Sequence, residues 1–220
     1  MKPSQRIKAE RESKAREKQA DKAARRGRGV GLQGRRPQER PSFPKLLIVC
    51  EGEKTEPEYF QAFPVRGVEV TVEGLGDNTL SLVTRAIEMH EDGDYDETWV
   101  VFDRDSFPPE RFRASIDKAT AAGLRVAYTN EAFEAWYLMH FHYCDSALSR
   151  DTYSGRLTDA LGRPYRKRDP GMYWALLSRQ PDAIRHANNL LDHHGPGHDP
   201  EAANPSTTVH LLVQRLNELR

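Results

Sequence analysis

The chain has 220 residues, of which 37% are hydrophobic and 30% carry a formal charge. This length suits one α/β domain with appendages. No apolar run approaches the roughly 20 residues of a membrane span, and the basic start lacks the apolar stretch of a signal peptide. Cys50 and Cys144 lie far apart without a CxxC pair, which argues against a disulfide framework or a zinc ribbon. We therefore expect a soluble cytoplasmic protein that does not associate with membranes.

The formal net charge of zero hides an uneven distribution. Residues 1–44 contain 14 Lys and Arg against 5 Asp and Glu, a net of +9, whereas residues 45–220 carry a net of −9. Residues 1–44 also contain almost no large apolar side chains, so we expect a disordered or loosely helical basic arm. Such an arm predicts contact with DNA or RNA, and a solubilising tail is the alternative. The acidic remainder would repel nucleic acid unless cations intervene, which hints at a bound metal.

Strands and helices are expected to alternate after residue 45. The apolar run at 46–50 is typical of a strand buried on both faces. A helix follows, which Thr55 and Glu58 are expected to open as a capping box and which Pro64 ends. The next expected elements are a strand at 68–72, a helix through Leu80 and Ile87, a strand at 99–102, a helix from Pro108–Pro109 to a Gly123 cap, and a strand at 124–128. This order predicts an α/β fold with a mainly parallel four-stranded sheet flanked by helices.

The chain beyond the fourth strand is expected to be helical. Aromatic residues recur at helical spacing from Phe133 to Phe141, and most are assigned to core packing. Residues 145–171 are rich in Arg, Gly and Asp and are expected to form a surface excursion. Further helices are expected near 172–178, 182–192 and 205–219. The predicted parts are a basic arm (1–44), an α/β domain (45–143) and a helical extension packed on that domain (144–220).

Carboxylates cluster after two of the predicted strands. Glu51 follows the first strand, and Asp103 and Asp105 follow the third. In parallel sheets ligands lie at the carboxyl ends of strands, so these side chains are expected to converge. Crowded carboxylates repel one another, and Mg²⁺ or Mn²⁺ would neutralise them while accepting hard oxygen ligands. The sequence therefore predicts a divalent metal site, with simple capping of helices or turns as the alternative.

Other polar motifs have simpler interpretations. His193, His194 and His198 superficially suggest a metal cluster, but no acid or Cys accompanies them at a recognised spacing, which favours a mobile loop. Asn204 and Ser206 could reach the acidic site, although capping of the last helix explains them. The sequence contains no GxSxG, Walker A or GxGxxG motif, so serine hydrolase, P-loop ATPase and Rossmann functions lack support.

Four segments together resemble a known family. They are CEGEKTEPEYF, VFDRDSF, TNEAFEAWYLMHF and NPSTTVHLLV, in that order. They are similar to the RloB family, small proteins linked to restriction loci and phage defence, over roughly residues 45–215. The first two also look like the signature segments of the Toprim domain of topoisomerases, bacterial primases, recombination-repair proteins and OLD-family nucleases. The resemblance therefore implies a Toprim-like fold, and the basic arm looks like a segment common in the RloB family.

The resemblance implies roles for individual residues. Glu51 matches the Toprim glutamate, a metal ligand in nucleases and also a proton shuttle in topoisomerases. Asp103 and Asp105 match the DxD pair that binds magnesium. Lys54 follows the glutamate and could contact a phosphate, or could be a solvated surface lysine. Glu134 could be a fourth ligand in a two-metal arrangement, or could pair with an arginine or the helix terminus.

The functional hypotheses differ in what the acids do. Lys167, within the basic triplet 166–168, could offset charge in a transition state or belong to a solvated or substrate-facing loop. The leading hypothesis is a Mg²⁺-dependent endonuclease of DNA or RNA in antiphage defence by abortive infection, with a possible defence-system partner protein. One alternative is a non-catalytic Toprim-like module that binds nucleic acid or a nucleotide within a defence complex. Another is a phosphatase or receiver-like phosphoacceptor at Asp103.

Overall fold

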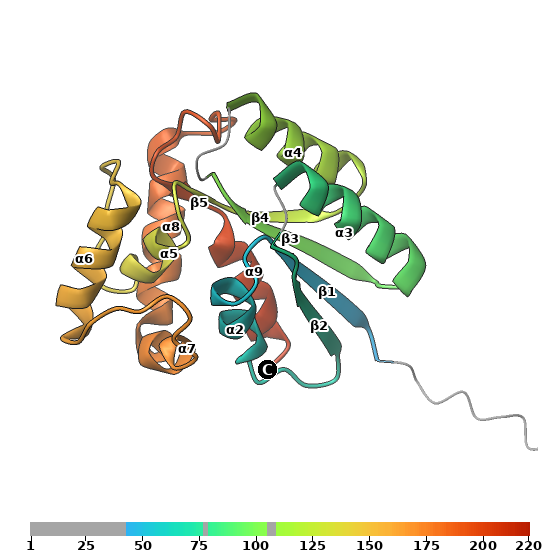
Figure 1. Cartoon of the computed structure of the whole chain (residues 1–220), viewed down its shortest axis with the longest axis horizontal. Coiled ribbons are helices and arrows are strands. Elements are labelled where there is room, and N and C mark those ends of the chain that lie inside the picture. The colour runs from blue at the N-terminus through green and yellow to red at the C-terminus, as the bar shows by residue number, and fades with distance from the viewer. Residues whose placement is uncertain (1–42, 77–78, 105–108) are drawn as a thin grey trace, which may run out of the picture. The chain divides into compact units, whose positions relative to one another are not determined.

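Five strands form one sheet in the order β2-β1-β3-β4-β5 (Figure 1). The computed structural model of the protein describes residues 43–76, 79–104 and 109–220. The strands are β1 Lys45–Cys50, β2 Glu69–Gly74, β3 Glu97–Asp103, β4 Arg125–Asn130 and β5 Ser206–Thr207. The first four strands pair in parallel, and β5 is antiparallel to β4. The mainly parallel sheet is therefore confirmed, with one short strand more than predicted.

Helices cover both faces of the sheet. They are α2 Thr55–Gln61, α3 Thr79–Gly93, α4 Pro109–Ala121, α5 Glu134–Leu138, α6 Arg150–Leu161, α7 Met172–Leu176, the 3-10 helix η1 Leu177–Arg179, α8 Gln180–His194 and α9 Val209–Glu218. In Figure 1, α3 and α4 lie on one side of the sheet and the other helices lie on the opposite side. None of the described helices combines the length and apolarity needed to cross a membrane.

Two hydrophobic layers meet at the central strands. Leu47 and Val49 of β1 pack with α3 and α4, together with Phe102 of β3. Leu46 and Ile48 face the other way, toward the layer built from α2 and α5 to α9. Alternate side chains of one strand thus enter opposite cores, which explains the uninterrupted apolar sequence of β1. Because the second layer includes the C-terminal helices, Phe43–Arg220 forms a compact unit of its own.

The predicted basic arm lies outside the described residues except for its last two positions, and so does Asp105. The capping box at the first helix was wrong. Thr55 is already the first residue of α2, the residue before it is Lys54, and no side chain caps this end. The helix ends at Gln61, before Pro64. The Gly-Glu-Lys turn after β1 therefore leads into α2 without a capping hydrogen bond from a side chain.

A helix replaces part of the surface excursion expected at 145–171. The Ser149 side chain accepts a hydrogen bond from the Thr152 N–H at 3.3 Å, which opens α6. Gly162 ends the helix in the left-handed conformation, with φ of 64°. Only Tyr153 and Leu157 of α6 are buried, so its sequence carries a weak apolar stripe.

The last helix begins later than expected because the residues before it complete the sheet. Ser206 and Thr207 pair with β4 as β5. Capping of the helix by Asn204 and Ser206 was therefore wrong: Thr208 precedes α9, and no side chain caps it. The Thr208 N–H and the Thr207 hydroxyl both donate to the Tyr128 carbonyl, each at 2.9 Å. These threonines satisfy backbone groups along the outer edge of β4.

Candidate functional site

The carboxyl ends of β1 and β3 lie side by side where the strand order reverses. In the sheet, β2 pairs with one edge of β1 and β3 pairs with its other edge, so the direction in which strands are added reverses after β2. Ligands of open α/β sheets bind at this kind of switch point. Glu51 directly follows β1, and Asp103 is the last residue of β3. The structure therefore brings together two of the three strand-end acids that the sequence singles out, and the third, Asp105, lies outside the described residues.

Glu51 is fixed at the end of the β1–β3 ladder. Its N–H donates to the Val101 carbonyl at 2.9 Å, which extends the ladder beyond β1. Its Oε2 accepts the Asp103 N–H at 3.1 Å. The Glu51 carboxylate therefore takes the place of a backbone acceptor, and this bond holds Glu51 against the backbone of Asp103.

Asp103 is a buried carboxylate with one unsatisfied oxygen. Its side chain is 9% exposed, and its Oδ2 accepts the Phe133 N–H at 3.0 Å and lies 3.6 Å from the Arg150 guanidinium. Its Oδ1 is buried without a hydrogen-bond partner in the described part of the chain. Burial, followed by the Glu56 and Glu134 carboxylates, raises the pKa of Asp103 well above its ordinary value. Its ionised form is therefore disfavoured unless a cation approaches.

Glu134, the first residue of α5, adds a carboxylate from beyond β4. Its side chain is 4% exposed and lies 4.0 Å from the Lys167 Nζ. The Tyr165 hydroxyl donates to its Oε1 at 3.1 Å. Burial and then Glu134 raise the pKa of Tyr165, so this phenol stays protonated at neutral pH. The structure thus brings Glu134 and Lys167 together, although the sequence treats them separately.

Glu56 joins these acids although no sequence motif singles it out. It lies in the first turn of α2 and is 9% exposed. Burial, and after it the Glu134 carboxylate, raises the pKa of Glu56, while Arg150 and Lys167 act in the opposite direction. Its carboxylate lies so close to Gly52 that a Cβ there would collide with it. An acid in a first helical turn ordinarily complements the helix dipole, which conceals this second role.

We call Glu51, Glu56, Asp103 and Glu134 the acidic cluster. Within the described ranges, no group of three or more His, Cys, Asp and Glu side chains is arranged to hold a metal ion. Two observations nevertheless suit a hard divalent cation: the partnerless Asp103 oxygen, and the mutual electrostatic destabilisation of buried carboxylates. Arg150 and Lys167 balance part of this charge from the chain itself.

Comparison with protein families identifies the chain. The model of the RloB family, described as RloB-like protein, matches residues 46–216. The chain belongs to the RloB family. Among curated proteins and among solved structures, no match was found. The acidic cluster of this RloB family member lies entirely inside the matched range, as do the four sequence segments that resemble the family.

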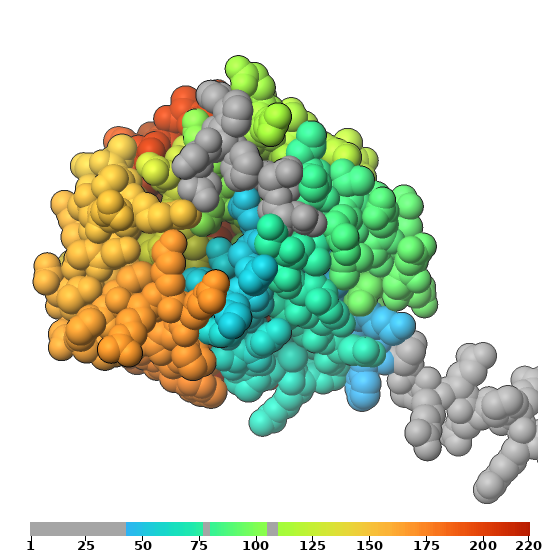
Figure 2. Space-filling view, in the orientation of Figure 1, coloured from blue at the N-terminus to red at the C-terminus, as the bar shows by residue number. Residues whose placement is uncertain are grey.

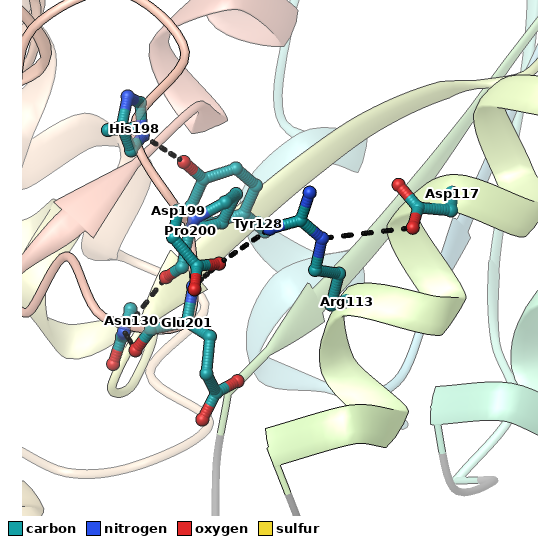
Figure 3. Close-up of polar contacts among 8 residues, drawn as sticks. All are labelled: Arg113, Asp117, Tyr128, Asn130, His198, Asp199, Pro200 and Glu201. Atoms are coloured by element: carbon teal, nitrogen blue, oxygen red, sulfur yellow. Dashed lines mark hydrogen bonds and ion pairs between the residues drawn. The ribbon is translucent and has the colours of Figure 1, made fainter.

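The structure also describes Lys54 and the three histidines that the sequence singles out. Lys54 is exposed on the turn between β1 and α2, where its contact with a phosphate stays a prediction. His193 and His194 end α8 rather than forming a loop. The His194 Nε2 donates to the Pro205 carbonyl at 2.8 Å, and the His198 Nε2 is hydrogen-bonded to the Tyr128 hydroxyl at 3.0 Å (Figure 3). His194 therefore joins the chain before β5 to α8, and His198 joins it to β4.

That same segment braces the carboxyl ends of β3 and β4. Figure 3 shows Asn130 reaching the Pro200 and Glu201 carbonyls, to which its Nδ2 donates at 3.0 Å each. The Glu201 Oε1 accepts from both the Nε and the Nη2 of Arg104, each at 2.6 Å. Because Arg104 directly follows Asp103, this pair fixes the chain where it leaves the acidic cluster.

Replacing Glu201 by glutamine is expected to lower the free energy of unfolding by about 1–3 kcal/mol. The Arg104 and Glu201 side chains are 22% and 14% exposed, so the change removes a charge from a largely desolvated pair. Urea denaturation measures the loss. Asp199→Asn is the matched control from the same loop, because Asp199 and its partner Arg113 are 46% and 58% exposed and their pair contributes at most about 1 kcal/mol. Equal losses in both variants would contradict a bracing role for Glu201.

Proposed function

We propose that this RloB family member is a nuclease with a Toprim-type site that uses Mg²⁺ or Mn²⁺ to cleave phosphodiester bonds of DNA or RNA in cytoplasmic antiphage defence. The burial of Asp103 beside Glu56 and Glu134, at the strand end where Glu51 also lies, carries the proposal. Buried carboxylates that raise one another's pKa destabilise a fold, and such groups concentrate at functional sites.

Each side chain has a defined part in this proposal. Glu51, Asp103 and Glu134, with Asp105, would hold the metal, which when bound supplies Lewis-acid activation of the phosphate and of water. Arg150 lies 3.6 Å from Asp103 and Lys167 lies 4.0 Å from Glu134, where they can contact the non-bridging oxygens of a phosphate and stabilise its developing charge.

Two further groups orient the site and exchange protons. The Tyr165 hydroxyl holds the Glu134 carboxylate in one orientation. The raised pKa of Glu56 suits a group that returns a proton to the leaving oxygen. The acidic cluster and its cations thus provide charge stabilisation and proton transfer within one buried region.

One observation favours a second function. Arg150 lies 3.6 Å from Asp103, and Lys167 lies 4.0 Å from Glu134, so the chain's own cations already compensate two of the acids. A site balanced in this way could bind a nucleotide or nucleic acid within a defence complex without cleaving it. Metal-dependent thermal stabilisation with no cleavage of any substrate would favour this module over the nuclease.

Purified protein is expected to cleave at least one of plasmid DNA, single-stranded DNA and tRNA when Mg²⁺ or Mn²⁺ is present. Asp103→Ala should reduce the rate at least about 100-fold because it removes a central carboxylate of the site. Asp117→Ala is the matched control, since this aspartate is 69% exposed on α4. Gel electrophoresis of the products measures the rates. Cleavage that survives EDTA or the Asp103→Ala change would belong to a contaminant and would contradict the proposal.

A further inference from the structure

A basic pocket adjoins the acidic cluster. The loop between α6 and α7 forms a cavity of 430 Å³, which is lined by Arg163, Pro164, Arg166, Lys167, Arg168, Asp169 and Pro170. Four cations and one carboxylate give this lining a formal net charge of +3. In Figure 2 the orange surface of the segment after α6 borders the cyan surface of the segment after β1. The pocket therefore concentrates positive charge in a body whose residues 45–220 are acidic overall.

Internal bonds shape the loop before any ligand binds. The Asp169 Oδ2 lies 2.7 Å from an Arg163 nitrogen, and its Oδ1 accepts the Gly171 N–H at 2.9 Å. Partial burial alone would raise the pKa of Asp169, but the Gly171 N–H and Arg163 lower it overall. Asp169 is therefore ionised at neutral pH and matched by Arg163. Of the other three cations of the lining, Lys167 lies 4.0 Å from Glu134, whereas Arg166 and Arg168 add positive charge beyond the Arg163–Asp169 pair.

One of these cations has an unusual backbone conformation. Arg168 has a φ of 67°, in the left-handed region that residues other than glycine rarely adopt. Such conformations persist where the surroundings impose them, and they concentrate at ligand sites. Arg166, Lys167 and Arg168 are all exposed and can reach a ligand.

The loop that lines the pocket also contacts the acidic cluster. Lys167 lines the pocket and lies 4.0 Å from Glu134. Tyr165, from the same loop, donates to that carboxylate. An anion in the pocket would therefore neighbour the acids that the proposed function uses. A strand of nucleic acid carries a phosphate at each nucleotide, so one strand can place successive phosphates in the two places.

An exposed aromatic residue adds a preference for unpaired bases. The Arg163 Nη2 lies 4.0 Å from the Met172 sulfur, which joins the start of the loop to the start of α7. Trp174 follows Pro170, the last residue of the pocket lining, by four positions and is 61% exposed. An exposed indole that follows a basic pocket closely in the chain suits single-stranded nucleic acids, which stack their bases on aromatic side chains, whereas bases inside a duplex cannot do so.

We propose that the 163–170 pocket binds a phosphate of a single-stranded nucleic acid and that Trp174 stacks a neighbouring base. This subsite rests on the proposed function, which places it beside the phosphodiester bond that is cleaved. Binding of nucleic acid to the subsite requires no cleavage. The proposed substrate is therefore a single-stranded nucleic acid, either single-stranded DNA or the loops and ends of RNA.

Binding of labelled oligonucleotides to the full chain in EDTA tests the subsite separately from the chemistry. Fluorescence anisotropy with deoxy- and ribo-oligonucleotides of one sequence, each single-stranded and as a duplex, gives Kd against salt concentration. Arg166→Ala with Arg168→Ala should lower the slope of log Kd against log salt for single strands by about 1.4, or about 0.7 for each phosphate contact. Trp174→Ala should weaken single-strand binding about 10-fold and leave duplex binding unchanged.

Controls come from other exposed positions. Arg185→Ala removes a cation of α8 that is 59% exposed, and Tyr143→Ala removes an aromatic side chain that is 40% exposed. Neither should alter single-strand binding. An unchanged salt slope in the double variant, or an equal loss of duplex binding in Trp174→Ala, would overturn the subsite. Pocket-dependent binding without cleavage by the unmodified protein would retain the subsite and reject the nuclease, whereas cleavage with pocket-independent binding would do the reverse.

Discussion

Asp103→Asn is expected to raise the melting temperature of the metal-free protein while it abolishes cleavage. The buried Asp103 carboxylate is destabilised by burial and by two neighbouring acids, and asparagine removes that charge at nearly constant volume. The amide oxygen can still accept the Phe133 N–H, and the amide nitrogen can donate to an adjacent carboxylate. The expected gain is about 1–3 kcal/mol, equivalent to roughly 2–4 °C for each kcal/mol in a domain of this size.

The sign of the pH dependence follows from the raised pKa. Below its ordinary pKa, Asp103 is neutral in both the folded and the unfolded chain and has no effect. As the pH rises from the ordinary pKa to the raised folded-state pKa, the unfolded chain is ionised while folded Asp103 keeps its proton, so the folded protein loses stability. The advantage of Asp103→Asn should therefore be largest near neutral pH and shrink as the solution is acidified.

Thermal denaturation in EDTA across this pH range, repeated with Mg²⁺, measures both effects. Added Mg²⁺ should stabilise the unmodified protein more than Asp103→Asn, because only the former keeps the full set of carboxylates. Asp117→Asn, on the exposed face of α4, should follow the unmodified protein in every condition. A lower melting temperature for Asp103→Asn would mean that its pairing with Arg150 outweighs the repulsion, and would contradict a site strained for metal binding.

Gly52→Ala is expected to lower the free energy of unfolding by about 1–3 kcal/mol and to reduce cleavage at least about 10-fold. A Cβ at this position would collide with the buried Glu56 carboxylate, which would then be displaced from the acidic cluster. The stability loss should shrink when Glu56→Ala is also present, because the colliding group is gone. Urea denaturation of the four proteins in this cycle measures the coupling.

A second glycine provides the matched control for that cycle. Gly155 is exposed within α6, and a Cβ there would meet no atom within 4 Å. Gly155→Ala should therefore stabilise the protein by about 0.5–1 kcal/mol through helix propensity and leave cleavage unchanged. Additive losses of stability from Gly52→Ala and Glu56→Ala would show that the collision does not govern the site.

The sheet and two members of the acidic cluster could be predicted from local patterns, and the family resemblance singled out a third member, Glu134. An apolar run that ends in an acid identifies a buried parallel strand with a carboxylate at its ligand-binding end, and this was sufficient to join Glu51 with Asp103. The adjacency of Glu134 and Lys167 could not be read in this way. It depends on the loop after α6 returning to the start of α5, which no periodicity encodes.

The missed features share a dependence on contacts between distant segments. β5 contains two residues, and its existence rests on pairing between Thr207 and Thr129, 78 positions apart. Helix α6 was missed because its buried face comprises only Tyr153 and Leu157. Glu56 resembles an ordinary acid of a first helical turn until the fold packs it beneath the other carboxylates. Tertiary packing, and not the local sequence, determines each of these features.

The two helical layers that cover the sheet differ in what they contribute to the acidic cluster, and this difference is useful for labelling experiments. The acidic cluster and its cations come from strand ends, α2, α5, α6 and the loop that follows α6, so α3 supplies none of them in the described chain. A fluorescent dye or an affinity handle on the outer surface of α3, for example at the exposed Glu91, would leave the chemistry undisturbed. That helix is therefore the natural place for a reporter in single-molecule studies of how this protein meets its target.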